Sequence, residues 1–237
     1  MTTSDHIDDL AGALALPTSG ADLYAVAPLA LTTPRARFLK RSLDLVGMVP
    51  LMALLVVVTP FVALAIATTS RGPVLFRHTR TARDGRQFTM LKFRTMHSDA
   101  EERLERDPEL LATYLANDFK VPLRHDPRVT KVGRLLRKLS LDELPQALNV
   151  ARGDMSLVGP RPIVAAQVQD LYGDDADAYL VCKPGLSGMW QVSGRSSVGS
   201  TDRASLDREY AESWTLRRDL LILLRTVPTV LSTRGAH

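Results

Sequence analysis

The pattern of apolar positions is dominated by one uncharged stretch, Leu45 to Ser70, which lies between Asp44 and Arg71. As a helix, its roughly 26 residues would be about 39 Å long, which is enough to span the hydrocarbon core of a bilayer. The pattern therefore predicts a membrane segment, which we take together with its basic flanks as residues 35–71.

Basic residues flank this segment at both ends. Such residues prefer the cytoplasmic side of a membrane, so if both flanks obey this preference the helix enters the bilayer and turns back; an ordinary single-pass helix with a tolerated proline stays open beside this re-entrant helix. The preferred break is Thr59-Pro60, since proline removes a backbone donor and the threonine hydroxyl can satisfy a freed carbonyl inside lipid. The flanking residues are Arg35, Arg37, Lys40 and Arg41 before the segment and Arg71, Arg77 and Arg80 after it.

The pattern after the membrane segment predicts a small hairpin and a divided helix. Two short apolar runs, 72–76 and 87–91, flank the turn signal Arg83-Asp84-Gly85, as the strands of a hairpin would. The stretch from Ser98 to Leu115 is rich in Glu, Leu, Ala and Arg and has an acidic start, which predicts a helix that Pro108 divides. Little other strand signal is visible.

The C-terminal part shows helical periodicity. Leu206, Tyr210 and Trp214 recur at four-residue spacing and form one face of an amphipathic helix, and the apolar run from Leu220 to Leu224 is too short to span lipid. These segments either pack on the core, which is the more common outcome, or lie in the membrane interface. The chain is thus predicted to have an α+β fold that is mainly α.

Composition narrows the class of protein. Among 237 residues, 30 Lys and Arg exceed 26 Asp and Glu by 4, which suits anionic partners without identifying them. Cys182 is the single cysteine, so an intrachain disulfide and a cysteine-rich metal site are excluded and a reducing compartment fits best. The N-terminus lacks the features of a secretory signal, and residues 1–34 are interpreted as a mobile leader without assigned function.

The densest group of chemically informative residues runs from Lys131 to Pro162. Asp142 and Glu143 can divide two tasks, in which one carboxylate attacks a phosphorus atom and the other holds Mg²⁺ against a diphosphate. Arg137 and Arg161 can then offset the negative charge and stabilise the transition state.

A purely structural interpretation of the same residues stays open. Ser140-x-x-Glu143 has the spacing of a capping box, in which the serine caps a helix and the glutamate folds back to it. Asp142 would then complement the helix dipole, and a helix start of this kind would also attract a phosphate.

Two further basic motifs have chemical and structural interpretations. Pro160 and Pro162 hold the backbone around Arg161, which suits presentation of the guanidinium to a phosphate or a base, but an exposed turn has the same pattern. Lys92 and Arg94, with His97 nearby, suggest a phosphate or metal cluster, although a single histidine in such a run is usually a surface residue and is not assigned as a ligand.

Taken together, these segments resemble the bacterial sugar transferase family, the monotopic polyprenyl-phosphate phosphoglycosyl transferases, from about residue 38 to the C-terminus. The motifs that carry the resemblance occur in the same order as in the family: Lys40-Arg41-x-x-Asp44, Arg71-Gly72-Pro73-Val74, Lys92-Phe93-Arg94-Thr95-Met96, Asp126-Pro127-Arg128-Val129-Thr130, Leu139-Ser140-Leu141-Asp142-Glu143-Leu144-Pro145-Gln146, Gly153-Asp154-Met155-Ser156, Gly159-Pro160-Arg161-Pro162 and Lys183-Pro184-Gly185-Leu186-Ser187-Gly188.

The resemblance implies a two-step reaction. Asp142 would attack the β-phosphate of a UDP-sugar, release UMP and hold a phosphosugar that a polyprenyl (undecaprenyl) phosphate then accepts. Glu143 would ligate Mg²⁺, while Arg137 and Arg161 would contact phosphate or nucleotide. Asp154 would stabilise the site residues without contacting the substrate itself. Its motifs also put further residues among those that bind substrate: Lys92, Arg94, Pro160 and Pro162.

The resemblance also implies an arrangement at the membrane. A re-entrant helix, 35–71, would precede a helical catalytic domain, 72–237, with a small hairpin and amphipathic interfacial helices. We expect this domain at the cytoplasmic face of the bacterial inner membrane, with the bilayer as partner and without nucleic acid; a homodimer is left open. Only the core catalytic part of the family is expected, without the spanning helices that precede it in larger members.

Two positions depart from the family pattern. His78-Thr79-Arg80-Thr81-Ala82 stands where Gln-x-Arg-x-Gly is expected, so no role of that glutamine or glycine transfers to this chain. Pro60 lies about three residues beyond its expected place, close to one helical turn.

Two other functions compete with this one. One is direct glycosyl transfer with release of UDP, and the other is a non-catalytic, membrane-anchored basic scaffold or nucleic-acid binder. The second is disfavoured because basic residues are interleaved with acidic ones rather than gathered on one helix, and no nucleic-acid motif appears. The sequence does not identify the sugar.

Overall fold

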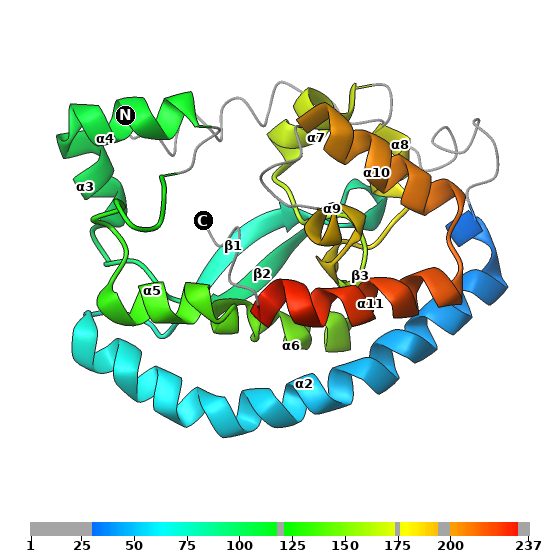
Figure 1. The fold of residues 1–237 in the computed structure, drawn as a ribbon, viewed down its shortest axis with the longest axis horizontal. Coiled ribbons are helices and arrows are strands. Elements are labelled where there is room, and N and C mark those ends of the chain that lie inside the picture. Colours follow the sequence, from blue (N-terminus) through cyan, green and yellow to red (C-terminus); the bar gives the residue numbers. More distant parts are fainter. Residues whose placement is uncertain (1–29, 118–120, 174–175, 194–199, 232–237) are drawn as a thin grey trace. The chain divides into compact units, whose positions relative to one another are not determined.

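The computed structural model describes residues 30–117, 121–173, 176–193 and 200–231 (Figure 1). The predicted leader, 1–34, lies almost wholly outside these residues. The chain divides into two compact units built from interleaved segments. The first unit comprises Met1–Met48, His78–Met90 and Asn149–Val227, and the second comprises Val49–Arg77, Leu91–Leu148 and Pro228–His237.

The predicted membrane segment forms a helix, α2, from Pro34 to Thr69, after a short 3₁₀ turn, η2, from Ala30 to Thr32. Pro34 suits the first helical position because its missing N–H would have no partner there. Pro50 and Pro60 both lie inside the helix. The Thr59 hydroxyl donates to the Leu55 carbonyl at 2.6 Å, one residue before the carbonyl that Pro60 cannot serve. The re-entrant geometry and the break at Thr59-Pro60 stay predictions.

Helix α2 is long and apolar enough to cross a membrane by length and composition. Only 17% of its most apolar window is buried, which distinguishes it from the core helix of a soluble protein. The side chains that it leaves exposed are large and apolar, which supports contact with lipid. They include Phe38, Val46, Val49, Val56, Val57, Phe61 and Leu64.

The predicted hairpin is confirmed, with shifted ends. β1 covers Leu75–Thr81, β2 covers Gln87–Phe93, and a 3₁₀ turn, η3, joins them at Arg83–Gly85. Asp84 and Gly85 have φ values of 63° and 76°, the left-handed conformation that Asp and Gly tolerate best in a turn. The first strand begins later than predicted, after Pro73, which cannot donate to a ladder.

The second unit packs its apolar side chains around the C-terminal half of α2. Leu55, Val62 and Ile66 form a buried cluster with Phe93 from β2, and α5, Lys131–Lys138, contributes Leu136. The predicted division at Pro108 is also confirmed, because α3 covers Ala100–Arg106 and α4 covers Pro108–Ala116. Asp107 caps α4 by accepting from the backbone of Glu109 and Leu110 at 3.1 and 3.0 Å.

The first unit contains a strand pair that the sequence pattern did not predict. β3, Ser156–Val158, pairs in parallel with β4, Gly185–Ser187, in the register Ser156 to Gly185 and Val158 to Ser187. Three-residue strands are too short to show alternation. A Cβ on Gly159 or Gly185 would collide with the backbone of the other segment, so this close approach explains both glycines.

Helices surround this strand pair in the first unit. Helix α10, Ser200–Glu212, buries Tyr210, and Trp214 is buried shortly after it, which confirms core packing for this face. Helix α11, Leu216–Leu231, leaves Leu220, Leu221 and Leu224 exposed, and its interfacial position stays a prediction. Further helices among the described residues are α6, Gln146–Arg152, which begins in the second unit, and α7, Ala165–Tyr172, α8, Ala176–Leu180, and α9, Met189–Val192, in the first.

A buried polar network fixes the start of α2 within the first unit. The Lys40 ammonium lies 2.8 Å from the Asp219 carboxylate, which is fully buried. Asp219 also accepts from the Tyr210 hydroxyl at 2.8 Å and the Trp214 indole at 3.0 Å. Asp44 accepts from Ser156 Oγ at 2.8 Å, so the Lys40-Arg41-x-x-Asp44 motif is structural in this unit.

Candidate active site

Asp142 lies in a single 3₁₀ turn, η4, Leu141–Glu143, directly after α5. Ser140 joins the two elements with φ 54° and ψ 19°, the left-handed conformation that commonly ends helices. Its side chain makes no capping hydrogen bond. The capping-box interpretation is therefore wrong, because the Ser140 backbone reverses the chain at a helix end instead of starting a new helix.

The Asp142 carboxyl group is buried, with 9% of the residue exposed. Burial raises the pKa of this carboxyl above its ordinary value, and the adjacent Glu143 charge raises it further. Lys92 and Arg137 act in the opposite direction on the same pKa and favour the carboxylate. The site therefore holds a carboxyl whose ionisation depends on the cations around it.

Glu143 faces β2 rather than its own helix end. Its Oε1 accepts from Lys92 Nζ at 2.8 Å, and both side chains are partly exposed. Lys92 therefore compensates the negative charge of Glu143 beside Asp142. The two residues are 51 positions apart, so no local sequence pattern predicts this contact.

Arg137, from the last turn of α5, donates through Nε to Thr95 Oγ1 at 3.0 Å. Burial lowers the pKa of its guanidinium, whereas the charges of Asp142 and Asp126 raise it. Helix α5 approaches the Thr95 segment closely, because the Thr95 carbonyl accepts from Thr130 N at 3.0 Å and occupies the space of a Gly133 side chain. This contact brings Lys92, Arg137 and Asp142 into one electrostatic group.

The loop before α5 is held by an internal ion pair. Asp126 accepts from Arg128 Nε and Nη2 at 2.9 Å each, in the fork geometry that strengthens such pairs. The Arg128 guanidinium also lies 5.1 Å from the Tyr114 ring centre. Thr95 and Asp126 lie within motifs of the sequence, but nothing in their spacing predicts the groups that they bind here.

Arg94 directly follows β2, and its side chain binds the backbone just after the end of α2. Its Nη1 and Nη2 donate to the carbonyls of Arg71 and Ser70 at 2.6 and 2.8 Å. Both carbonyls directly follow Thr69, the last residue of α2, so Arg94 fixes the backbone where the chain leaves the helix. Substrate binding by Arg94 stays a prediction, and its observed contacts are structural.

Metal binding can be judged from the donor set. In the part of the chain that the structure describes, no three or more His, Cys, Asp or Glu side chains gather as a metal site. Mg²⁺ commonly uses one or two carboxylates and completes its coordination with water and substrate phosphates. Glu143, beside Asp142 and partly exposed, fits that mode, in which the substrate supplies the remaining ligands.

The other predicted site residues belong to the first unit. The Pro160 carbonyl accepts from Gly185 N at 2.8 Å, and the Arg161 carbonyl accepts from Arg203 Nη2 at 2.9 Å, so the turn around Arg161 is tied down through its backbone. Asp154 is partly buried, and its charge raises the pKa of Lys183, which burial lowers overall. The substrate-binding roles of Pro160, Arg161 and Pro162 stay predictions, as does support by Asp154.

Comparisons with known proteins agree with this arrangement of motifs. A family model described as bacterial sugar transferase matches residues 35–233. The undecaprenyl-phosphate galactose phosphotransferase of Salmonella typhimurium is 44% identical over 208 residues, which cover 85% of this chain and 42% of that protein. The chain thus spans less than half the length of this relative.

Two other relatives are covered more fully. The UDP-glucose:undecaprenyl-phosphate glucose-1-phosphate transferase of Caulobacter vibrioides is 43% identical over 206 residues, covering 84% of this chain and 72% of that protein. The exopolysaccharide production protein ExoY of Rhizobium meliloti is 40% identical over 202 residues, covering 84% of this chain and 88% of that protein.

Proposed function

Because the chain belongs to the bacterial sugar transferase family, we propose that it transfers a hexose 1-phosphate from a UDP-sugar to a polyprenyl phosphate and releases UMP. The proposal follows the two relatives named as sugar phosphotransferases of undecaprenyl phosphate. Such a transfer would initiate synthesis of an exopolysaccharide or another glycoconjugate, as the name of the ExoY relative also suggests.

The chemistry would take two displacements at one phosphorus atom. A carboxylate oxygen of Asp142 attacks the β-phosphorus of the donor, and the bond from that phosphorus to the bridging oxygen breaks, so UMP leaves with the electron pair. An oxygen of polyprenyl phosphate then attacks the same phosphorus and displaces the carboxylate. Asp142 returns to its starting state, and the lipid carries a diphosphate-linked sugar.

The observation that carries this proposal is the setting of Asp142. It is a buried carboxyl group with a second carboxylate beside it and the cations Lys92 and Arg137 close enough to act on its pKa. The nucleophile must be ionised, so the two cations favour the reactive form and also offset repulsion from the donor phosphates. Mg²⁺ on Glu143 would neutralise the diphosphate, and Arg161 would contact phosphate or nucleotide.

A lipid acceptor requires that the protein work at a membrane. The exposed apolar surface of α2 supports membrane association. The basic residues on both flanks of the apolar stretch support the cytoplasmic face, where nucleotide sugars are available.

The decisive test is the identity of the released nucleotide. The full chain in detergent or nanodiscs is mixed with undecaprenyl phosphate, Mg²⁺ and one UDP-sugar at a time, beginning with UDP-galactose and UDP-glucose. We expect UMP with one of these donors. Release of UDP would instead establish direct glycosyl transfer, and no turnover with any UDP-sugar would favour a non-catalytic role.

A further inference from the structure

Arg128 and Arg137 in the second unit are held in contrasting ways. Arg128 donates through Nε and Nη2 to the two carboxylate oxygens of Asp126 at 2.9 Å each, so its charge is paired within the protein. Arg137 donates through Nε to a neutral hydroxyl, Thr95 Oγ1, at 3.0 Å. Among the residues that the structure describes, its guanidinium makes no other hydrogen bond and no ion pair, and the side chain is partly exposed. Both Nη groups are therefore available to a ligand.

Thr95 is itself fixed by the start of α5. Its carbonyl accepts from Thr130 N at 3.0 Å and from Thr130 Oγ1 at 3.3 Å. The Thr130 hydroxyl oxygen also accepts from Gly133 N at 2.8 Å and so caps the helix. Thr95 is buried and β-branched, which restricts rotation of its hydroxyl about χ1. The group that receives Arg137 thus has a defined place.

Gly133 allows this arrangement. A Cβ on Gly133 would collide with the Thr95 carbonyl, so any other residue would push α5 away from the segment that follows β2. Arg137 follows Gly133 by four residues, which places both on the same face of the helix. The arginine side chain points back toward this close approach and reaches the Thr95 hydroxyl.

The end of β2 and the residues after it hold a charged side chain on each side of Asp142. Lys92 lies 2.8 Å from Glu143, the residue after Asp142. Thr95 binds Arg137, from the last turn of the helix that precedes the Asp142 turn. In agreement with this placement, the Arg137 charge lowers the pKa of the Asp142 carboxyl. A hydroxyl three residues after Lys92 therefore sets the direction of a guanidinium beside the proposed nucleophile.

We propose that Thr95 is a positioning residue, whose hydroxyl orients the Arg137 guanidinium so that both Nη groups face a phosphate of the donor. The inference rests on the proposed function for the identity of that phosphate. A hydroxyl suits this task better than a carboxylate, because it holds Nε without neutralising the charge that the phosphate must meet. Arg128 has the alternative arrangement, in which Asp126 takes up the donors within the protein.

The test is a double-mutant cycle on the full chain in detergent, with kcat/KM for the UDP-sugar as readout. Thr95→Val removes the acceptor and keeps the side-chain shape, so we expect kcat/KM to fall about tenfold or more, the effect of losing a hydrogen bond to a charged group. Thr95→Ser keeps the hydroxyl and should stay within about threefold of wild type. In an Arg137→Gln background, Thr95→Val should change kcat/KM by less than about twofold, because the side chain that it positions is gone.

The cycle distinguishes positioning from a role in the fold alone. An equal fall for Thr95→Val in the wild-type and Arg137→Gln backgrounds would overturn the proposal, as would a Thr95→Ser chain that is as slow as Thr95→Val. Wild-type kcat/KM in Thr95→Val would overturn it as well. Thr113→Val, the same substitution at an exposed position of α4, is the matched control and should behave as wild type does.

A second readout needs no turnover. NMR of the chain labelled with ¹⁵N-arginine follows the Arg137 Nε proton, which Arg137→Lys assigns. Its exchange with water should be about tenfold faster in Thr95→Val than in wild type and unchanged in Thr95→Ser. Unchanged exchange in Thr95→Val would overturn the proposal.

Failure of the proposed function can be told apart from failure of this inference. If the wild type turns over with release of UMP and the cycle shows no coupling, the function stands and the role of Thr95 falls. If the wild type does not turn over, calorimetry with inorganic pyrophosphate decides. Several-fold weaker binding by Thr95→Val but not by Thr95→Ser would keep the positioning role, and equal affinities would remove it.

Discussion

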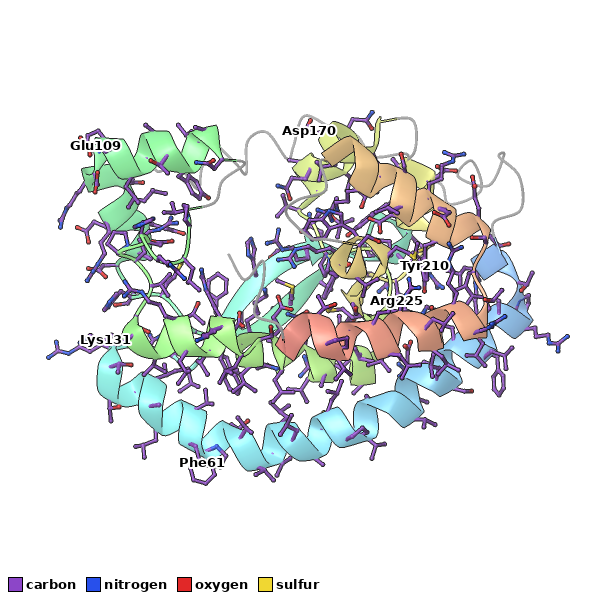
Figure 2. The ribbon with its side chains drawn as sticks, viewed as in Figure 1. Phe61, Glu109, Lys131, Asp170, Tyr210 and Arg225 are labelled. Atoms are coloured by element: carbon purple, nitrogen blue, oxygen red, sulfur yellow. The ribbon has the colours of Figure 1, made fainter. Side chains whose placement is uncertain are left out.

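The two units hold their charged side chains in opposite ways. Around Asp142 in the second unit, Lys92 pairs with Glu143 at 2.8 Å and Arg128 is forked onto Asp126. In the first unit, Arg203 lies 3.8 Å from the buried Asp207 carboxylate, and the charges of Arg161 and Arg203 lower the pKa of Arg80. Figure 2 shows charged side chains along both sets of elements. Paired charges suit a reaction centre whose protonation must be controlled, whereas neighbouring guanidinium groups disfavour one another's charged forms.

The largest effect should come from the group around Asp142. Asp142→Asn removes the attacking oxygen's charge while keeping its shape, so we expect turnover to fall about a thousandfold or more with the fold retained. Radiolabelled donor measures the rate, and circular dichroism checks the fold. Normal turnover by the purified variant would remove Asp142 from the mechanism.

The covalent step has a separate readout. After exposure to donor without acceptor, intact-protein mass spectrometry should show the wild type heavier by one phosphosugar, located by peptide mapping at Asp142. The Asp142→Asn chain serves as the blank. A wild type that stays unmodified while turning over would favour direct transfer to the lipid.

Glu143→Gln should give the next largest effect. It removes the carboxylate that Lys92 faces and the donor expected to hold Mg²⁺, so we expect a loss of about 10–100-fold in rate and a higher Mg²⁺ concentration for half-maximal activity. Glu101→Gln, an exposed glutamate on α3, is the control. A rate loss with an unchanged Mg²⁺ dependence would leave Glu143 as a partner of Lys92 only.

The pH dependence should separate the two units. Burial raises the pKa of Asp142, so the rate should rise with pH as this carboxyl ionises, at pH values above those of an ordinary aspartate. Asp207, in the first unit, has its pKa raised to about 6, mainly by burial. Between the ordinary value near 4 and about 6, the native state binds more protons than the unfolded state, so Asp207 reduces the free energy of unfolding as pH rises.

Asp207→Asn tests this separation. We expect the variant to lose that part of the pH dependence of Tm between pH 4 and 6, while the pH at which the rate is half-maximal stays where the wild type has it. Thermal unfolding and initial rates measured across the same buffers give both quantities. A shifted rate profile would mean that the ionisation of Asp207 also affects the reaction at Asp142.

The smallest effect is expected away from both groups. Asp107→Ala removes the side chain that caps α4 and should cost about 1 kcal/mol of local stability. Hydrogen exchange of the α4 amides would detect it, and the rate constant should not change. A slower reaction would link α4 to the Asp142 group.

Elements with strong local signals were predictable from sequence. Arg83-Asp84-Gly85 and Pro108 act within a few residues, so the hairpin and the break between α3 and α4 appeared where expected. The β3 and β4 strands did not, because three residues carry no periodicity and their pairing joins positions far apart.

The sequence motifs located the candidate site, but they did not predict the contacts between its side chains. Ser140-x-x-Glu143 predicted a cap by spacing, and spacing does not reveal the positive φ of Ser140 that makes the cap impossible. The pair of Lys92 with Glu143 and the contact of Arg137 with Thr95 depend on tertiary packing, which the order of residues along the chain does not display.

The contact between Lys40 and Asp219 bears on how the chain is made. The two residues are 179 positions apart, so during synthesis the Lys40 ammonium at the start of the apolar helix has no Asp219 counterion until the segment that contains Asp219 has left the ribosome. Ribosome-bound chains that stop before Asp219 should therefore expose this end of the helix to proteases and chaperones. By this contact, the first unit can be completed only after Asp219 has been synthesised.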